Sequence, residues 1–418
     1  MIVKSFVLRR ESAARIASEC QEGAVIVVRS EKKLETMFRS VIRKALVDKQ
    51  PLAEDFSTIE AYFNAISPDP VYRERVAATL NGLATYLSEG MYIQTTLTSI
   101  EDYVLSKCAR LCAEAVNVTV HGVLVDSTEL MICRSHGARA VVDWSLSRQE
   151  ITSRCVSDKK IVVSGGYGRL ETGYVVRIGR GGAYLMTTLI AAALGASRVE
   201  IYVEGAGIAG VMAMTYDEAA HYCSSDLAPF PSAALWPVKA AGIPLVVRSI
   251  MDPDFPGTII SAFGAQDGRT VSGVLLDKDL ELITVFGTGL LGQVGLSSTV
   301  FSALSGAGVN VRFISQSSSE YSLSLAVLQE DASRAVEAIV AHTGDYEDVM
   351  MLRRTVGIVT VYGDRMKNVP GTSGKVYGAL GEAGISIVAA AQGGEELSIS
   401  MAVDASAASR AADILRTL

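Results

Sequence analysis

The final third of the chain contains an internal repeat, and this repeat constrains the fold more than any other feature. Matching residues recur at one spacing: Gly287 with Gly363, Gly295 with Gly371, Ala303-Leu304 with Ala379-Leu380, Ala307-Gly308 with Ala383-Gly384, and Gln316 with Gln392. Within each pair the residue numbers differ by 76. A constant spacing of this length predicts two copies of one structural unit, which we call the first and second copies.

Each copy carries three apolar runs, separated first by a glycine-containing loop with a helix-like stretch and then by a polar corner. The runs cover residues 282–286, 309–314 and 322–327 in the first copy, and 358–362, 385–389 and 397–403 in the second. Short apolar or alternating runs of this kind are typical of strands. We therefore predict a ferredoxin-like βαββαβ fold for each copy, at about 280–345 and 355–418, with residues 271–276 as a further strand of the pair.

The residues before the repeat alternate apolar runs with helical stretches. The runs at 25–28, 118–125, 160–164, 198–203 and 244–248 read as buried strands, and the segments 98–116 and 184–194 read as helices. This alternation predicts a layered α/β domain with a mainly parallel sheet. Because Asp252 to Gly257 contains two prolines, we expect the chain to leave the first domain there, giving domains at 1–262 and 263–418.

Length, charge and apolar content favour a soluble cytoplasmic protein. A chain of 418 residues is expected to hold two or three domains. The net charge of -7 and the pI near 5.3 argue against a nucleic-acid partner. No apolar run reaches the roughly 20 residues that a membrane span requires. Met1 to Arg10 lacks the apolar region of a signal peptide, so we expect neither a membrane partner nor secretion.

The cysteines and histidines do not form a recognisable metal site. Six cysteines are scattered through the first 223 residues without a Cys-x-x-Cys pattern: Cys20, Cys108, Cys112, Cys133, Cys155 and Cys223. Cys108 and Cys112 share a helix face, but no histidine is spaced to complete a metal site with them. We therefore expect reduced core cysteines and no bound metal at these positions.

The repeat resembles the paired ACT domains of aspartokinases. The resemblance rests on Gly287-Thr-Gly-Leu-Leu-Gly-Gln-Val-Gly295, Ala307-Gly-Val-Asn310 and Ile314-Ser-Gln-Ser-Ser-Ser-Glu320, and in the second copy on Val369-Pro-Gly-Thr-Ser-Gly-Lys375 and Ala391-Gln-Gly393. In that family the paired domains hold an amino-acid effector, lysine or threonine. The resemblance implies effector binding by Gln316, Gln392, Gly295 and Asn310. Alternatively, both glutamines merely complete a turn.

The first domain resembles the catalytic part of the same family. Gly179-Arg-Gly-Gly182 matches the family's LGRGGSDYSA segment, and Ala241 to Arg248 and Phe255 to Ser261 are similar to its closing strand and exit. The resemblance implies an amino-acid-kinase-like fold with substrate bound by Arg180, Gly181 and Gly182. An arginine can grip a carboxylate in bidentate fashion. The loop Gly165-Gly166 also permits close approach of a ligand, although a tight turn would explain it equally.

Two charged residues are catalytic candidates by the same resemblance. Lys4 follows a short apolar start, where the family has the lysine of its KFGGTS motif, which neutralises charge on the transferred phosphoryl group. Glu101 lies in Thr98-Ser-Ile-Glu-Asp102 at an expected helix start, and is similar to the family's substrate-binding glutamate. An ordinary solvated charge remains the alternative for each residue, since acidic residues are common in a first helical turn.

The chain departs from the family pattern where the nucleotide should bind. Ser5 to Arg10 replaces the small residues FGGTS, and Ala183-Tyr184 replaces the Ser-Asp that follows the glycine-rich segment. Val203-Glu204 stands for a Thr-Asp pair, and Ser224 to Pro231 contains no lysine to meet ATP phosphates. Each loss removes a group that would stabilise phosphoryl transfer, a chemistry that depends on positioned donors and cations.

Two functions remain open. The first is a divergent aspartokinase that uses ATP and magnesium to phosphorylate the side-chain carboxylate of aspartate or a close analogue, under ACT control, with Arg9 or Arg10 replacing lost phosphate contacts. The alternative is a nucleotide-incompetent relative, without a cofactor, that senses an amino acid or hosts another reaction in the old pocket. In either case we expect a homodimer formed through residues 280–418, because the edge strands of small sheets need cover.

Overall fold

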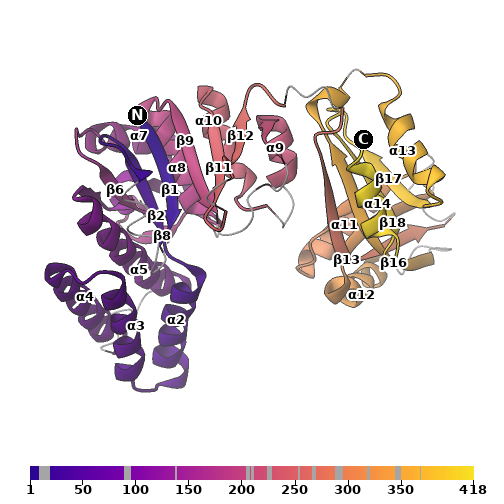
Figure 1. Ribbon diagram of the computed structural model, residues 1–418. Coiled ribbons are helices and arrows are strands. Elements are labelled where there is room, and N and C mark those ends of the chain that lie inside the picture. Colours follow the sequence, from indigo (N-terminus) through magenta and orange to yellow (C-terminus); the bar gives the residue numbers. More distant parts are fainter. Residues whose placement is uncertain are drawn as a thin grey trace. The chain divides into compact units, whose positions relative to one another are not determined.

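The computed structural model divides the chain into two compact units, Met1–Gly264 and Ala265–Leu418, which we call the N-terminal and C-terminal units (Figure 1). The structure describes residues 1–8, 19–88, 96–136, 139–203, 208, 211–223, 228–252, 255–265, 270–287, 295–317, 321–343, 350–367 and 369–418. The candidate phosphate-contact residues Arg9 and Arg10, Glu204, and most of the loop 287–295 lie outside these residues. Among the described residues, no helix combines the length and apolar character needed to cross a membrane.

The N-terminal unit is built on an eight-stranded sheet in the order β10-β12-β11-β9-β1-β2-β6-β3. The strands are β1 (Ile2–Val7), β2 (Val25–Arg29), β3 (Val123–Val125), β6 (Ile161–Ser164), β9 (Arg198–Val203), β10 (Ala213–Thr215), β11 (Leu245–Ser249) and β12 (Thr258–Ser261). Every neighbouring pair is parallel except β11 with β12. The predicted mainly parallel sheet is therefore confirmed.

Continuous burial explains the composition of the central strands. Val25 to Val28 on β2 are inaccessible to solvent, as are Val162 and Val163 on β6. Strands buried on both faces carry unbroken apolar runs rather than alternation, and β-branched side chains suit them. A smaller sheet, in the order β5-β4-β7-β8, lies in the same unit and comprises β4 (Ile132–His136), β5 (Arg139–Val142), β7 (Tyr167–Leu170) and β8 (Val175–Arg177).

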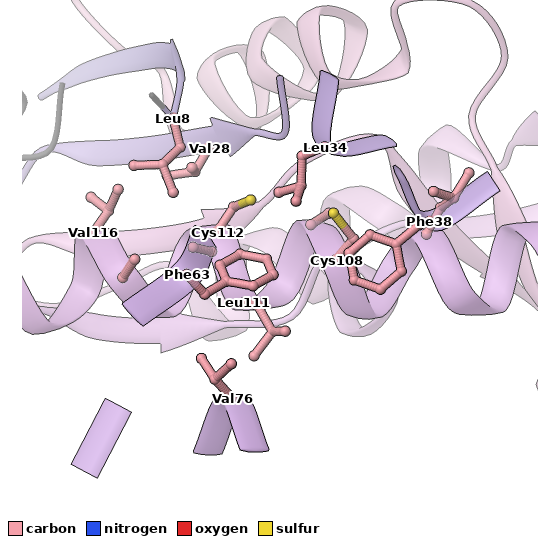
Figure 2. Close-up of a cluster of buried hydrophobic side chains, with 14 of the residues drawn as sticks. Leu8, Val28, Leu34, Phe38, Phe63, Val76, Cys108, Leu111, Cys112 and Val116 are labelled. Atoms are coloured by element: carbon pink, nitrogen blue, oxygen red, sulfur yellow. The ribbon is translucent and has the colours of Figure 1, made fainter. Parts of the chain in front are cut away.

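Helices α2 to α5 form the main apolar cluster of this unit with the sheet. They are α2 (Lys32–Arg43), continued by a π-helical turn (Lys44–Asp48), α3 (Ala53–Ile66), α4 (Pro70–Ser88) and α5 (Leu97–Val120). Figure 2 shows Phe38 of α2 beside Cys108 of α5, and Phe63 of α3 and Val76 of α4 near Leu111 of the same helix. The remaining helices are α6 (Ser127–Leu130), α7 (Trp144–Arg154), α8 (Gly182–Leu194), α9 (Tyr216–Cys223), a 3₁₀ turn (Ser232–Ala234) and α10 (Leu235–Ala241).

The predicted strand over residues 118–125 is wrong in its first half. Helix α5 continues through Val120 and ends at His121, which has a left-handed φ of 52°. Only Val123–Val125 form the strand β3. The β-branched run from Val118 favours a strand locally, but Val116 and Val120 are buried on the helix, so tertiary packing overrides the local preference.

All six cysteines are buried free thiols, as predicted. The side chains of Cys108 and Cys112 lie in the apolar cluster of Figure 2. Burial raises the pKa of Cys20 and of Cys133 to about 11, so these thiols are not poised to act as nucleophiles. Among the described residues, no group of three or more His, Cys, Asp or Glu side chains is arranged to hold a metal ion.

The C-terminal unit contains one six-stranded sheet in the order β14-β15-β13-β16-β18-β17. Its strands are β13 (Gly273–Phe286), β14 (Phe313–Gln316), β15 (Ser322–Leu328), β16 (Met350–Tyr362), β17 (Ile387–Gln392) and β18 (Ser398–Asp404). Its helices are α11 (Leu296–Gly306), α12 (Ala332–Thr343), α13 (Thr372–Glu382) and α14 (Ala408–Leu415), with 3₁₀ turns at Gln329–Asp331 and Asp364–Met366. Strand β14 begins only at Phe313, later than the apolar run from Val309 predicts.

The two long strands β13 and β16 each serve both copies of the repeat. The first part of β13, Gly273 to Asp277, pairs with the end of β16 beside the strands of the second copy. After an irregularity, where Asp279 has a φ of 59°, β13 continues from Leu280 beside β15 and pairs with the beginning of β16. The sheet of the first copy therefore includes the beginning of β16. The sheet of the second copy includes the beginning of β13.

The two ends of this sheet lie close to each other. Ser315 Oγ on β14 donates a hydrogen bond to the carbonyl oxygen of Ala390 on β17, at 2.9 Å. An apolar cluster that includes Leu280, Phe313 and Ala402 lies between the copies, with Ala389 packed against it. The edge strands of the pair are therefore partly covered within the chain itself.

Candidate functional site

A cavity of about 1040 Å³ in the N-terminal unit brings together two residues that the sequence indicates as functional, Glu101 and Arg180. We call it the α5–β8 cavity, because its charged walls come from the start of α5 and from the end of β8 with the turn that follows it. Its lining includes Arg39, Glu101, Asp102, Arg177, Gly179 and Arg180. Its volume is close to the upper limit of about 1,000 Å³ for small-molecule sites.

The start of α5 places two carboxylates side by side in the α5–β8 cavity. Thr96 is the N-cap, and its side chain accepts a hydrogen bond from the backbone N–H of Ser99. A threonine in this position satisfies an otherwise unpaired N–H of the first turn. Glu101 and Asp102 follow in the second turn of the helix, and both line the cavity.

Each of these carboxylates has an arginine partner. Glu101 forms an ion pair with Arg39 of α2. Asp102 accepts a hydrogen bond from the backbone N–H of Arg177, at 2.9 Å, and its other oxygen lies 3.9 Å from Arg177 Nε. Burial raises the pKa of Asp102, although the hydrogen bond and the charge of Arg177 act in the opposite direction. The contact between Asp102 and Arg177 thus links α5 to the end of β8 at the wall of the cavity.

The glycine-rich turn before α8 is shaped largely by close packing. Gly179 and Gly181 have left-handed φ values of 62° and 68°, which favour glycine. A Cβ atom on Gly181 would lie 2.6 Å from the ring of Pro231, and one on Gly182 would lie 2.8 Å from Cβ of Ile178. Protein atoms therefore fill the space beside Gly181 and Gly182, and the glycines need no ligand to explain them.

The loop Gly165-Gly166, which follows β6, is also occupied by protein. A Cβ on Gly165 would lie 2.7 Å from the carbonyl oxygen of Val28, and Gly166 has a φ of 94°. The carbonyl oxygen of Gly166 accepts a hydrogen bond from the N–H of Ile178, at 3.0 Å. This hydrogen bond links the loop after β6 to the segment that carries Arg177 and Arg180.

Tyr184 covers the first turn of α8. Its side chain is almost fully buried, at 5% exposure, and the guanidinium carbon of Arg29 lies 4.1 Å from its ring centroid. Phe230 lies on another side of the ring, with centroids 6.1 Å apart. Arg29 ends β2, and the sequence does not single it out. Tyr184, in the first turn of α8, is therefore buried in contact with a cation and a second aromatic ring.

Lys4 lies in another part of the unit. It projects from the middle of β1, is 6% exposed, and forms an ion pair with Glu200 of β9 at 2.9 Å. Its ammonium also donates to the carbonyl oxygen of Glu19, at 2.7 Å. Lys4 lines a second cavity of about 570 Å³ with Arg198, Glu200 and other residues, whereas Glu101 and Arg180 line the α5–β8 cavity.

Glu200 is the centre of a buried charge cluster. Besides Lys4, Arg198 Nη2 lies 2.6 Å and Arg248 Nε lies 3.8 Å from its carboxylate oxygens. Tyr202 donates a hydrogen bond to the same carboxylate, at 3.2 Å. Burial alone would raise the pKa of Glu200, but the hydrogen bond from Lys4 and the three cationic charges outweigh it and hold the pKa below its ordinary value.

The effector residues expected in the repeat lie at corresponding strand and helix ends of the two copies. Gln392, at the end of β17, lines a cavity of about 300 Å³ with Gly371 and Ser373, and Ser373 Oγ donates to Gln392 Oε1 at 3.4 Å. Its counterpart Gln316 ends β14, and both glutamines are exposed. Gly295 caps α11 with a φ of 95°. Asn310 is exposed, and the loop preceding Gly295 lies outside the described residues.

Sequence reasoning missed three charged residues of the α5–β8 cavity: Arg39, Asp102 and Arg177. Asp102 adjoins the predicted Glu101, and Arg177 lies three positions before the predicted Arg180. A search for charged residues around each motif would have found these two. Arg39 had no such signal, since only the packing of α2 against α5 brings it to the site.

The chain matches known proteins over both units. The ACT domain family model matches residues 283–342 and 359–417. A bifunctional aspartokinase/homoserine dehydrogenase from Haemophilus influenzae is 30% identical over 307 residues, which cover 69% of this chain and 37% of that protein. The chain spans less than half the length of the bifunctional relatives compared.

Solved structures show the same fold. E. coli aspartokinase III in complex with lysine and aspartate superposes with a TM-score of 0.83 at 18% identity, covering 100% of this chain and 99% of that chain. The same enzyme in complex with aspartate and ADP gives a TM-score of 0.74, with the same coverage. The chain thus combines an amino-acid-kinase-like α/β unit with a pair of ACT units. It belongs to the aspartokinase family.

Proposed function

We propose that this chain binds an aspartate-like amino acid in the α5–β8 cavity and acts as a nucleotide-incompetent, ACT-regulated member of its family. The observation that carries this proposal is the separation of the candidate residues. Glu101 and Arg180 line one cavity, whereas Lys4 lines another and is paired with the buried Glu200. The groups suited to an amino acid are together, and the group suited to a phosphoryl transfer is not with them.

The α5–β8 cavity has the chemistry to hold a zwitterion. A guanidinium such as that of Arg180 binds a carboxylate through two parallel hydrogen bonds, and carboxylates such as Glu101 and Asp102 accept from an ammonium group. The lining of the cavity carries both signs of charge, which suits a ligand that carries both. A neighbouring solved structure is described with bound aspartate, which supports the same class of ligand.

The packing of the described residues around α8 supports the proposal that no ATP phosphate chain binds there. Protein atoms fill the space beside Gly165, Gly181 and Gly182, and Tyr184 covers the start of α8. A phosphate site requires open backbone N–H groups and cations aimed at the phosphate oxygens. We therefore derive no phosphoryl-transfer step and no magnesium site from these residues.

Phosphorylation of aspartate with ATP and magnesium is the second candidate. Family membership favours it, as does the ADP complex described for the neighbouring enzyme. Arg29 and Arg180 both lie near the beginning of α8 and would have to supply the cationic environment, with Arg29 leaving the ring of Tyr184. The two candidates differ in whether Mg-ATP binds.

Isothermal titration of the purified chain distinguishes these functions. We expect saturable binding of L-aspartate and no binding of Mg-ATP. Arg180→Ala should abolish aspartate binding, while Arg148→Ala, on the exposed side of α7, should leave it unchanged. Saturable Mg-ATP binding followed by aspartate phosphorylation would establish the second candidate. An aspartate affinity unaffected by Arg180→Ala would refute the proposed site.

We further propose that the ACT pair senses an amino-acid effector and that the chain is a cytoplasmic homodimer through residues 280–418. The cavity at Gln392 supports effector binding in the second copy. Strands β14 and β17 partly cover each other. We therefore do not expect the dimer to form by pairing of these edge strands with those of a second copy. Light scattering at micromolar concentration should give twice the chain mass of 44.3 kDa; a monomeric mass would contradict the dimer.

A further inference from the structure

The second cavity of the N-terminal unit, of about 570 Å³, has no part in the proposed function. We call it the β1–β9–β11 cavity, because its lining includes Lys4 of β1, Arg198 and Glu200 of β9, and Arg248 of β11. The register of the parallel strands explains this grouping. Lys4 pairs with Glu200, and Arg248 pairs with Tyr202, so these side chains project from one face of the sheet. The cavity thus collects three basic side chains around one buried carboxylate.

Arg198 and Arg248 carry hydrogen-bond donors that the protein does not use. The Nε atoms of both are shielded from solvent and have no hydrogen-bond acceptor in the described part of the chain. The Nε of Arg248 lies 3.8 Å from Glu200, which is too far for a hydrogen bond. The side chains are nevertheless 44% and 31% exposed, so their outer nitrogens reach the cavity. A guanidinium with unused donors at a cavity wall is suited to an anionic ligand.

The acidic residues of the lining do not account for these arginines. The carboxylate of Glu200 already serves Lys4 and the Tyr202 hydroxyl, at 2.9 and 3.2 Å. Glu19 accepts a hydrogen bond from the same hydroxyl. Glu22 is largely exposed and lies 3.7 Å from Lys160, which is outside the lining. An anion that enters the cavity would therefore meet arginine donors that these carboxylates leave open.

We propose that the β1–β9–β11 cavity binds a phosphate group, with Arg198 and Arg248 as its ligands. A guanidinium binds phosphate oxygens through two parallel hydrogen bonds, and two guanidinium groups match the charge of a phosphate dianion. Lys4 keeps its contacts with Glu200 and with the carbonyl oxygen of Glu19, and adds positive charge nearby. This site is separate from the proposed amino-acid site and requires no nucleotide.

Titration of the unmodified protein with inorganic phosphate gives the first test. Chloride holds the ionic strength constant, so that general screening is the same at every point. We expect saturable binding of one phosphate per chain. Phenyl phosphate then identifies the source of the group: tighter binding than inorganic phosphate indicates a phosphomonoester, whose apolar part can contact Phe255 of the lining, and equal or weaker binding indicates the free anion. No saturable binding of either compound would overturn the inference.

Substitutions assign the phosphate to the two arginines. Arg198→Gln and Arg248→Gln should each weaken phosphate binding about tenfold, since each removes a charged pair of hydrogen bonds. Arg148→Gln, on the exposed side of α7, is the matched control and should keep the full affinity. Phosphate binding that is unchanged in both arginine variants would refute the site.

The proposed amino-acid site provides a cross-check. Arg248→Gln should leave aspartate binding unchanged, and Arg180→Ala should leave phosphate binding unchanged, because the two residues line different cavities. Loss of phosphate binding in Arg180→Ala but not in Arg248→Gln would place the anion in the α5–β8 cavity and refute this inference. Failure of aspartate to bind the unmodified protein would refute the proposed function alone.

Glu200→Gln separates a binding site from a purely structural charge cluster. The substitution removes the carboxylate that competes with phosphate for Arg198 and Arg248, so phosphate should bind about tenfold more tightly. Phosphate should also raise the midpoint of thermal unfolding more in this variant than in the unmodified protein, because a tighter ligand stabilises the folded state more. An equal or weaker phosphate affinity of the folded variant would contradict the inference.

Discussion

Lys4 shows how a residue can match a motif by position and differ from it by environment. Its place near the start of β1 suggested a catalytic ammonium, yet the strand continues through Val7 and the side chain pairs with Glu200. Sequence order cannot reveal such a partner, because β9 is almost 200 residues further along the chain. The parallel pairing of β1 with β9 places Lys4 directly opposite Glu200.

Glu200→Gln should destabilise the N-terminal unit. The substitution leaves the ammonium of Lys4 buried without its compensating charge, and breaking a buried ion pair costs about 3 to 5 kcal/mol of unfolding free energy. Urea denaturation at pH 7 measures this loss. Glu22→Gln is the matched control, because its carboxylate is largely exposed and should change the free energy by less than about 0.5 kcal/mol. A similar effect of both substitutions would contradict the importance of the buried cluster.

The same cluster makes stability depend on pH. The pKa of Glu200 is lower in the folded chain than its ordinary value of 4.5, so the unfolded chain takes up the proton more readily. Its contribution to stability is therefore fully present above pH 4.5 and is lost as pH falls toward the folded pKa. The difference in urea midpoint between the unmodified protein and Glu200→Gln should shrink below pH 4.5. A difference that stays constant to pH 3 would exclude this linkage.

At the scale of elements, most of the fold was open to prediction from residue patterns. Buried strands such as β2 and β6 contain unbroken apolar runs, and the repeat located the elements of both copies. The errors arose where local preference and packing disagree, as at the end of α5, where Val118 and Val120 are helical. The candidate site was predicted less completely. Arg180 and Glu101 belong to motifs, whereas Arg39 reaches the cavity only through helix packing.

Two glycines in the C-terminal unit should respond in opposite ways to alanine. A Cβ on Gly357 in β16 would lie 2.4 Å from Cβ of Ala408 on α14, so Gly357→Ala forces these elements apart, at a cost of about 1 to 3 kcal/mol. A Cβ added to Gly378, on the exposed side of α13, would meet no atom within 4 Å, and Gly378→Ala should stabilise by about 0.5 to 1 kcal/mol. Denaturant midpoints of both variants test this, and two changes of the same sign would contradict it.

At the scale of the whole molecule, the C-terminal unit should fold as one piece and not as two. The first copy depends on the beginning of β16 for its outer pairing, and the second copy depends on the beginning of β13. A fragment of residues 265–418 should therefore unfold cooperatively on heating, as followed by circular dichroism. A fragment of residues 270–343, which lacks β16, should show no cooperative transition. Cooperative unfolding of that shorter fragment would mean that the exchanged strand is dispensable.

The sharing of β13 and β16 between the two copies also limits how such a chain can evolve. A gene segment that encodes only one copy would specify a sheet with a missing strand, so neither copy can be lost, multiplied or replaced by recombination on its own. Point substitutions remain available to each copy separately, so the two copies can diverge in their side chains. The pair is thus inherited as an indivisible module, within which each half can change its side chains independently of the other.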